Sequence, residues 1–372
     1  MDQPARVLVV DDSKVFRSIL EKIISSIPGV QVIGGVGRGA DALEFLRMRT
    51  VDLVTLDVEM PEMNGLETLQ QIIAQKASFK AVPDVLMISS LTRTGSDITL
   101  KSLELGAFDF IAKPGASMQN AQEHLSRMLR NVITAWKTKH SLAAIRNSTV
   151  PSAASTKTLQ PQPAGFKYSL SPRSPHTKPV MAIVLGISTG GPKSLAEMLP
   201  KLCAVTDLPI LLVQHMPPNF TKSLADSLAT KCRHKVVECE SGMVVEHGHV
   251  YIAPGGNHMT VRTRGANFVL EVTQDPPENG CRPSVDVLFR SAAQAYPDDS
   301  LIGVVLTGMG NDGTPALPEL KRKNAWLIAQ DEESSVVFGM PRAAAATGLL
   351  DKVASLMQIP DAVLERINMV KR

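Results

Sequence analysis

The stretch RVLVVDD, Arg6–Asp12, decides the first half of the fold. A run of apolar residues that ends in two carboxylates is typical of a strand buried on both faces and finishing at a polar edge. Five such strands separated by helical patterns predict a flavodoxin-like, five-stranded parallel sheet over residues 1–140. The other strand-like runs are Val30–Gly34, Leu53–Leu56, Val85–Ser89 and Phe108–Ile111, and the helical patterns include Val15–Ile27, Leu66–Gln75 and a last helix over about Gln119–Lys137.

A second alternating pattern begins at Val180 and predicts a second doubly wound α/β domain over residues 180–372. Its segment 236–273 has short strand-like runs and no helical pattern, so we expect an antiparallel meander appended to the parallel sheet. The strand-like runs are Met181–Gly186, Ile210–Gln214, Val236–Cys239, His249–Ala253, Met259–Arg262, Phe268–Thr273, Ile302–Thr307 and Trp326–Gln330; the helical patterns are Lys193–Leu202, Lys222–Lys231, Val285–Ala295 and Met357–Ile367.

Between the two patterns, residues 141–179 are rich in Pro, Ser and Thr and poor in large apolar residues, which predicts a flexible linker. The positive charge of the chain is concentrated in and next to this linker, because residues 124–196 hold ten Lys and Arg and no acidic residue. The rest of the chain is net acidic, which argues against a nucleic-acid-binding domain. This basic linker would serve as a solvated tether, with docking onto an acidic partner as the alternative.

No secretory signal and no apolar run of about 18 residues is visible, so we expect a cytoplasmic protein without membrane insertion. The cysteines Cys203, Cys232, Cys239 and Cys281 are scattered and form no C-x-x-C pair. This spacing predicts neither a disulfide framework nor a zinc site.

Acidic residues follow two strands of the first domain. Asp11 and Asp12 end the first strand, and Asp57 ends the third. Because the carboxyl ends of parallel strands share one edge, these carboxylates should converge and require a hard cation such as Mg²⁺. Ser89 and Lys113 end the fourth and fifth strands. A hydroxyl and an ammonium beside a metal-bound carboxylate suit phosphoryl transfer, with Asp57 as the nucleophile.

The motifs VVDDS, LDVEMPEMNG, MISSL and FIAKP, within about residues 4–125, resemble the response-regulator receiver domain of two-component signalling. The resemblance implies that a histidine kinase is the phosphodonor and that Asp57 is phosphorylated. It also implies roles for other positions: Asp11 or Asp12, Asp57 and the backbone carbonyl of Glu59 as Mg²⁺ ligands, Ser89 as the switch hydroxyl, Phe110 as the aromatic that changes rotamer, and Lys113 as the phosphate contact.

In the second domain, Gly186-Ile187-Ser188-Thr189-Gly190 joins a strand to a helix with nucleophile-elbow spacing. A glycine-rich phosphate loop of a nucleotide-binding domain is the alternative interpretation of this motif. His215 follows the next strand, and Asp312 lies in the loop Gly308–Gly313 after a third. If these strands are parallel neighbours, Ser188, His215 and Asp312 meet at one edge and permit a serine hydrolase relay, with the Met309 N–H as an oxyanion donor.

The motifs GISTGGP, LLVQHMP, YIAPGGNHM, RPSVDVLFRSAA, TGMGNDG and FGMPRAA, in this order, resemble CheB-type chemotaxis protein-glutamate methylesterases over about residues 180–368. The resemblance implies hydrolysis of glutamyl methyl esters on the cytoplasmic helices of chemoreceptors, with methanol released and no cofactor in the esterase step. In many members it also implies deamidation of receptor glutamines. Ser188, His215 and Asp312 would be the triad, and Thr189 and Met309 would line the oxyanion site.

The resulting hypothesis is a monomeric, phosphorylation-regulated hydrolase whose first domain covers the triad cleft until Asp57 is phosphorylated. One alternative is a receiver-regulated serine esterase or amidase that acts on a different protein. A nucleotide-binding module is disfavoured because no acidic ribose-binding residue ends the second strand. A DNA-binding output is disfavoured by the acidic balance outside the linker.

Overall fold

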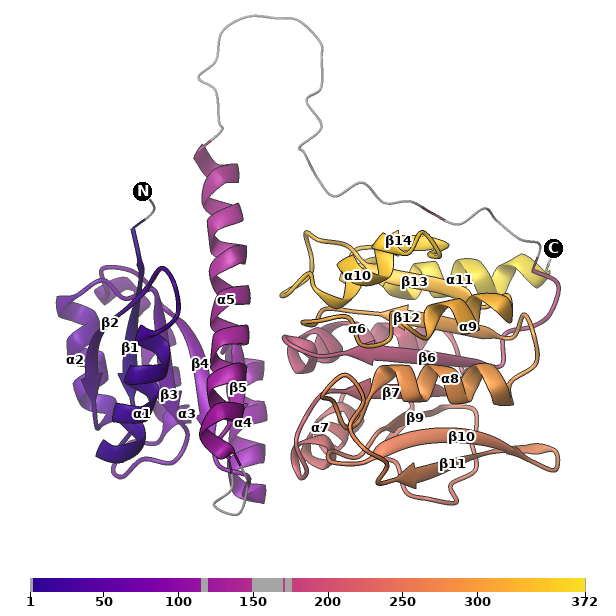
Figure 1. Ribbon diagram of the computed structural model, residues 1–372, viewed down its shortest axis with the longest axis horizontal. Helices are drawn as coiled ribbons and strands as arrows, with labels where there is room; N and C mark the ends of the chain where they lie inside the picture. The colour runs from indigo at the N-terminus through magenta and orange to yellow at the C-terminus, as the bar shows by residue number, and fades with distance from the viewer. Residues whose placement is uncertain (1–2, 115–119, 149–169, 171–175, 372) are drawn as a thin grey trace, which may run out of the picture.

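The computed structural model describes residues 3–114, 120–148, 170 and 176–371, and it contains two α/β domains that lie side by side (Figure 1). The first domain has a parallel sheet with strand order β2-β1-β3-β4-β5. The prediction of a five-stranded parallel sheet is therefore confirmed. Its strands are β1 (Ala5–Val10), β2 (Val30–Val36), β3 (Leu53–Asp57), β4 (Asp84–Ser89) and β5 (Asp109–Ala112).

Helices cover both faces of this sheet because its strands are apolar on both sides. The helices α1 (Lys14–Ser25) and α5 (Ala121–Ser148) pack on one face, while α2 (Gly39–Met48), α3 (Gly65–Ala74) and α4 (Arg93–Leu105) pack on the other. The 3₁₀ turn η1 spans Lys76–Ser78. The backbone of α5 stays helical to Ser148, eleven residues past the expected end at Lys137.

The second domain has a seven-stranded parallel sheet with order β14-β13-β12-β6-β7-β9-β8. Its strands are β6 (Ala182–Ile187), β7 (Ile210–Gln214), β8 (Lys235–Glu238), β9 (His249–Ile252), β12 (Leu301–Val305), β13 (Trp326–Gln330) and β14 (Lys352–Ala354).

The expected antiparallel meander over 236–273 is only half right. The strands β10 (His258–Arg264) and β11 (Asn267–Thr273) do form an antiparallel hairpin, but β8 and β9 pair parallel inside the main sheet. The chain between β8 and β9 makes its crossover without a helix and bridges Val244 to Val269 of β11 on the way. Most crossovers between parallel strands contain a helix. A segment without a helical pattern, such as 236–273, therefore favours antiparallel pairing when only the sequence is considered.

One face of the second sheet carries α6 (Gly191–Val205), α7 (Phe220–Ala229) and α11 (Ile359–Asn368). The other carries α8 (Val285–Ala295), α9 (Leu317–Arg322), α10 (Met340–Ala346) and the β10–β11 hairpin. The short helices α9 and α10 are absent from the sequence expectation because six or seven residues give no helical period. The remaining 3₁₀ turns are η2 (Leu356–Gln358) and η3 (Met369–Lys371).

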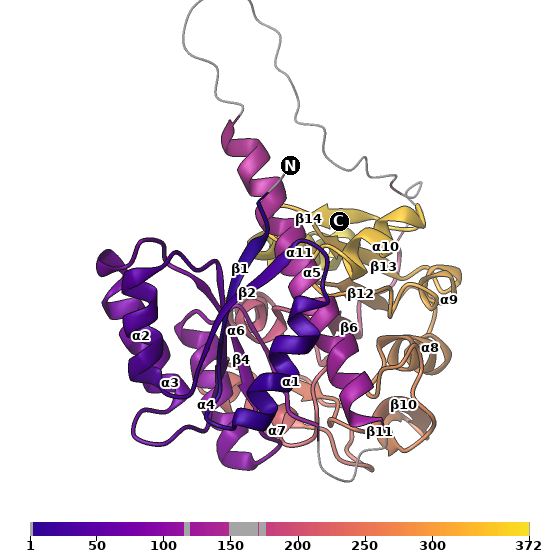
Figure 2. The same ribbon diagram turned by 60° about the vertical axis from the view of Figure 1, so that its left-hand side comes forward.

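The two domains meet along α4, which packs against α6 and α7 (Figures 1 and 2). One continuous cluster of buried apolar residues runs from the α2–α3–α4 face of the first domain into the α6–α7–α11 face of the second. The contact is therefore a packed apolar interface as well as a polar one.

Residues 176–180 dock onto the second domain ahead of β6, whereas 149–169 and 171–175 of the expected linker lie outside the described residues. The Asp299 carboxylate accepts hydrogen bonds from the backbone N–H groups of Thr177 and Lys178 and pairs with the His176 ring. The Arg366 guanidinium, which is 0% exposed, donates to the same carboxylate at 2.8 Å. This network ties the entering chain to α11.

We expect Asp299→Ala to destabilise the second domain by about 3–5 kcal/mol, because it leaves the buried Arg366 charge unpaired. Urea denaturation of the full chain, followed by Trp326 fluorescence, measures the change. Asp298→Ala is the matched control, since the neighbouring Asp298–Lys323 pair is exposed and should change stability by less than about 0.5 kcal/mol. Equal effects of the two variants would contradict the assignment.

Candidate active site and phosphoacceptor site

The end of β6 and the end of β7 lie side by side in the second sheet, where Ile187 pairs with Gln214. Ser188 and His215 are the next residues, and the His215 N–H donates to the Ile187 carbonyl at 3.1 Å. On the other side of β6, the Ser188 N–H donates to the Thr307 carbonyl just after β12. The strand ends that carry the three predicted residues are therefore adjacent.

The His215 and Asp312 side chains are in direct contact, with Nε2 2.7 Å from Oδ2. The same carboxylate accepts a hydrogen bond from the Val285 N–H at 2.7 Å and one from the Ser284 hydroxyl at 2.8 Å. Val285 begins α8, so a helix N-terminus faces the Asp312 anion. Asp312 is only 2% exposed, and these bonds fix both its position and its charge.

Burial alone would raise the pKa of Asp312, but the hydrogen bond and charge of His215 and the donors at the start of α8 hold it well below its ordinary value. Burial lowers the pKa of His215, but the hydrogen bonds and charges of Asp312 and Cys281 together outweigh burial and raise it, so the imidazolium is stabilised. This is the electrostatic arrangement that a proton-shuttling imidazole needs.

The pairing of Nε2 with Asp312 leaves Nδ1 as the ring nitrogen that faces away from the carboxylate. The Cys281 sulfur lies 3.8 Å from this Nδ1. The motif RPSVDVLFRSAA begins one residue after Cys281, so no motif that indicates the site includes this cysteine. A partly buried thiol beside the imidazole is thus a residue of the site that sequence reasoning missed.

Close packing around Ser188 explains the glycines of this edge. A Cβ on Gly308 would lie 2.8 Å from the Ser188 Cβ, and one on Gly186 would lie 2.4 Å from the Val285 side chain. Gly190 has a φ of 74°, which favours glycine, and it caps α6 directly after the elbow. Thr189 and Met309 lie beside Ser188 on these two loops and are both partly exposed.

Gln214 is a second residue that the sequence did not single out. Its amide Nε2 donates to the Ser188 carbonyl at 3.0 Å and to the His215 carbonyl at 3.2 Å. The side chain is buried, and it holds the two strand ends at a fixed separation. The signal in the sequence that could have indicated Gln214 is its position as a polar residue at the end of an apolar strand.

In the first domain, Asp11, Asp12 and Asp57 each offer a carboxylate oxygen within 4.8 Å of the other two. The Lys113 ammonium lies 2.8 Å from Asp57 and 3.0 Å from Asp11. The pKa of Asp57 is raised to about 6. Burial is the main cause and the Asp11 charge adds to it, while the Lys113 ammonium acts in the opposite direction. Three oxygen donors with one neighbouring cation fit a hard divalent ion, and Glu59 follows Asp57 by two residues.

The two predicted switch residues make different contacts, Ser89 within the first domain and Phe110 with the second domain. The Ser89 hydroxyl donates to the Gly95 carbonyl in the first turn of α4 at 3.2 Å. The Phe110 ring stacks on Phe220 of α7, with ring centroids 4.7 Å apart and planes 13° apart. Phe110 therefore contributes directly to the contact between the domains.

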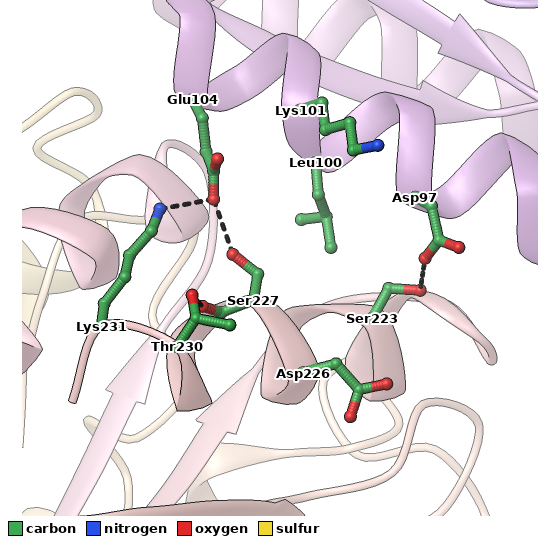
Figure 3. A pocket seen from close by; sticks show the side chains of 9 residues that line it. All are labelled: Asp97, Leu100, Lys101, Glu104, Ser223, Asp226, Ser227, Thr230 and Lys231. Atoms are coloured by element: carbon green, nitrogen blue, oxygen red, sulfur yellow. Dashed lines mark hydrogen bonds and ion pairs between the residues drawn. The ribbon is translucent and has the colours of Figure 1, made fainter. Parts of the chain in front are cut away.

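Polar contacts surround this stack. Glu104 of α4 accepts hydrogen bonds from Ser227 at 2.6 Å and from the Lys231 ammonium at 2.5 Å. The Ser223 hydroxyl donates to Asp97 at 2.5 Å. Figure 3 shows these side chains of α4 and of the α7 region facing each other across a polar pocket. The pocket is lined by Asp97, Leu100, Lys101, Glu104, Ser223, Asp226, Ser227, Thr230 and Lys231.

Asp109 at the start of β5 reaches the elbow itself. Its carboxylate accepts a hydrogen bond from the Phe110 N–H at 2.9 Å and lies near the Gly190 N–H, two residues after Ser188. Burial raises the pKa of Asp109 to about 7 despite these two donors. An acidic side chain of the first domain therefore lies against the loop of the second domain that carries Ser188.

This raised pKa predicts that the domain contact depends on pH. A carboxyl whose pKa is higher in the closed state favours closure when protonated, and this stabilisation is lost as the pH rises through about 7. We expect hydrogen-exchange protection of α4 and α7, corrected for intrinsic exchange rates, to fall between pH 6 and pH 8. Asp109→Asn should remove that change, and a wild-type protein with equal protection at both pH values would contradict it.

Comparisons with known proteins agree with both halves of the sequence interpretation. Residues 183–363 match the family model described as CheB methylesterase, and residues 7–125 match the response regulator receiver domain. Two relatives named protein-glutamate methylesterase/protein-glutamine glutaminase are similar over nearly the whole chain. The one from Desulfotalea psychrophila is 42% identical over 98% of this chain and 99% of its own, and the one from Pyrococcus abyssi is 40% identical over 98% and 94%.

A crystal structure of the Thermotoga maritima CheB methylesterase catalytic domain is 40% identical, covers 50% of this chain and 98% of that chain, and has a TM-score of 0.48. Among the described helices, none is both long and apolar enough to cross a membrane.

Proposed function

This chain belongs to the CheB methylesterase family, and on that premise we propose that it hydrolyses glutamyl methyl esters of chemoreceptors under the control of its receiver domain. The observation that carries the proposal is the His215–Asp312 pair at the strand edge that also carries Ser188. We assign the receiver to residues 1–140, the linker to 141–179 and the methylesterase domain to 180–372.

In the proposed reaction, the Ser188 hydroxyl attacks the ester carbonyl while His215 takes its proton. Because Nε2 is bonded to Asp312, Nδ1 is the ring nitrogen available as the base. Asp312 orients the ring and stabilises the imidazolium, which then protonates the departing methoxide so that methanol leaves. Water, deprotonated by the same nitrogen, hydrolyses the acyl-serine and restores the enzyme.

Backbone donors near Ser188 would stabilise the tetrahedral oxyanion. We assign this role to the Thr189 and Met309 N–H groups, on the elbow and on the loop after β12. A glutamine side chain has the same acyl geometry with ammonia as the leaving group, so the site also suits deamidation. The glutaminase part of the relatives' name agrees with this.

Regulation follows from the domain contact. Asp109 lies near Gly190 of the elbow, and Phe110 stacks on α7, so the unphosphorylated receiver would block the approach of a receptor helix. A phosphoryl group on Asp57, contacted by Lys113 and Ser89, would draw the Ser89 hydroxyl away from Gly95 and Phe110 away from Phe220. The first change would loosen α4 from β4 within the receiver, and the second would remove a contact that holds β5 on the second domain.

A divalent ion, Mg²⁺ in our proposal, would be held by Asp11 or Asp12, Asp57 and the Glu59 carbonyl. When bound it neutralises the acidic pocket and the incoming phosphoryl oxygens. Lys113 keeps one positive charge beside Asp57 throughout. The partners would be a histidine kinase and chemoreceptor helices in the cytoplasm, and the enzyme would act as a monomer.

The proposal is tested by methanol release from methylated receptor, with and without a small acyl phosphate as phosphodonor. We expect the phosphodonor to raise the rate in the presence of Mg²⁺ and to have no effect after chelation. Asp57→Asn should abolish the response, whereas Asp41→Asn, which changes a partly exposed side chain paired with Arg38 on α2 of the same domain, should keep it. A response that survives in Asp57→Asn would exclude Asp57 as the phosphoacceptor.

A further inference from the structure

The side chains of His215, Asp312 and Cys281 bring three metal-ligating groups together in the second domain. One donor atom from each lies within 4.8 Å of the other two. We propose that this cluster is an inhibitory site for a thiophilic divalent cation, Zn²⁺ in the first instance. The cluster comes from three remote positions, so the cysteine spacing that predicted no zinc site could not reveal it.

The metal ligands would be the Cys281 sulfur and the His215 Nδ1, both of which zinc prefers, with water completing the coordination, while Asp312 holds the ring from Nε2. Zn–S bonds of about 2.3 Å and Zn–N bonds of about 2.0 Å place sulfur and nitrogen about 3.5 Å apart in a tetrahedron. The Cys281 sulfur lies 3.8 Å from the His215 Nδ1, so a small closure completes the pair. Binding releases the thiol proton to solvent and leaves a thiolate on the metal.

The backbone holds Cys281 in place before any metal arrives. Glu278 and Cys281 exchange two backbone hydrogen bonds, of 3.1 and 2.8 Å. The two residues between them, Asn279 and Gly280, have φ values of 52° and 75°, as a tight hairpin turn requires. The sulfur therefore projects from a rigid turn, and little ordering entropy opposes metal binding.

The partners of His215 and Asp312 also suit a metal. A metal-bound histidine is normally oriented by a carboxylate on its other ring nitrogen, and Asp312 already bonds Nε2. Asp312 is in turn fixed by Ser284 and Val285, so the carboxylate cannot turn away. Cys281 and His215 are both partly exposed, which leaves a path for an ion to enter.

A cation on Nδ1 occupies the nitrogen that the proposed mechanism uses as the base. Bound Zn²⁺ would therefore stop ester hydrolysis reversibly, without touching the receiver. The inhibitory consequence rests on the proposed function, but metal binding itself does not. The experiment accordingly measures binding and inhibition separately.

Binding is measured first with Co²⁺ as a spectroscopic substitute for Zn²⁺, on the full-length protein without substrate. We expect a thiolate-to-cobalt charge-transfer absorption in the wild type that Zn²⁺ displaces. Cys281→Ala should abolish it, and Cys232→Ala should retain it, since Cys232 contacts Cys203 on the other face of the sheet. A band that persists in Cys281→Ala, or is lost in Cys232→Ala, would overturn the proposal.

Inhibition is measured next, by titrating Zn²⁺ against methanol release and reversing it with a chelator. Relative to its own zinc-free rate, Cys281→Ala should need at least about tenfold more Zn²⁺ for the same fractional inhibition. Cys281→His should restore zinc sensitivity without the sulfur absorption band. Equal zinc sensitivity in the wild type and Cys281→Ala would refute the site, whereas zinc binding in a protein without esterase activity would refute only the proposed function.

Discussion

Replacing Ser188 by alanine is expected to lower methanol release from methylated receptor by at least about 10⁴-fold. The expectation follows from the interdependence of a nucleophile and its base, since removing the attacking hydroxyl leaves His215 and Asp312 with no proton to move. The backbone donors and substrate binding remain, so a small rate above that in water should persist. Single-turnover release of methanol measures the effect.

Cys281→Ala is the decisive comparison for this prediction. The Cys281 thiol is the other potential nucleophile within reach of the imidazole, at 3.8 Å from Nδ1. If Ser188 attacks, Cys281→Ala should keep its activity while Ser188→Ala loses it. The reverse result would assign the reaction to a cysteine nucleophile and would end the serine mechanism.

Reversing the charge of Glu104 is expected to raise the basal, unphosphorylated esterase activity by about 5–30-fold. Glu104→Lys breaks the bonds to Ser227 and Lys231 and places two ammonium groups face to face across the interface (Figure 3). A loss of 1–2 kcal/mol from the closed arrangement corresponds to about this change in the population of the open one. Methanol release without a phosphodonor measures it.

The charge-swapped double variant Glu104→Lys/Lys231→Glu separates electrostatics from general disruption. It should restore much of the inhibition, because the pair is re-formed with opposite polarity. Arg262→Glu is the matched control, since it breaks the Arg262–Glu271 pair of the β10–β11 hairpin, which lies on the opposite face of the second sheet from α7. If Glu104→Lys leaves basal activity unchanged, the interface does not restrain the enzyme.

Much of the fold was predictable because it depends on local patterns. The buried strands β1, β3, β6 and β7 are continuous apolar runs that end in polar residues, and that pattern needs no tertiary information. The placement of β8 and β9 was not predictable in the same way. Their parallel pairing depends on a crossover through Val244 that contains no helix.

The same distinction between local patterns and tertiary placement applies to the candidate site. Ser188, His215 and Asp312 could be proposed because each directly follows or lies near a strand end, and strand ends of one sheet converge. The sequence could not predict that Asp312 pairs with Nε2, that Cys281 approaches Nδ1, or that Asp109 lies near Gly190. Each depends on how a loop or a whole domain is positioned, and no local pattern in the sequence records that.

The long helix α5 has a mechanical consequence. With 28 residues at a rise of about 1.5 Å each, it is a rod of about 42 Å that runs along the receiver and projects beyond it at its C-terminal end (Figure 1). Because both halves remain on one polypeptide, the receiver returns to its partner surface at an effective concentration set by the tether and not by the amount of protein in the cell. The inhibition that we propose would therefore be independent of expression level, and a receiver supplied as a separate molecule would be a far weaker inhibitor.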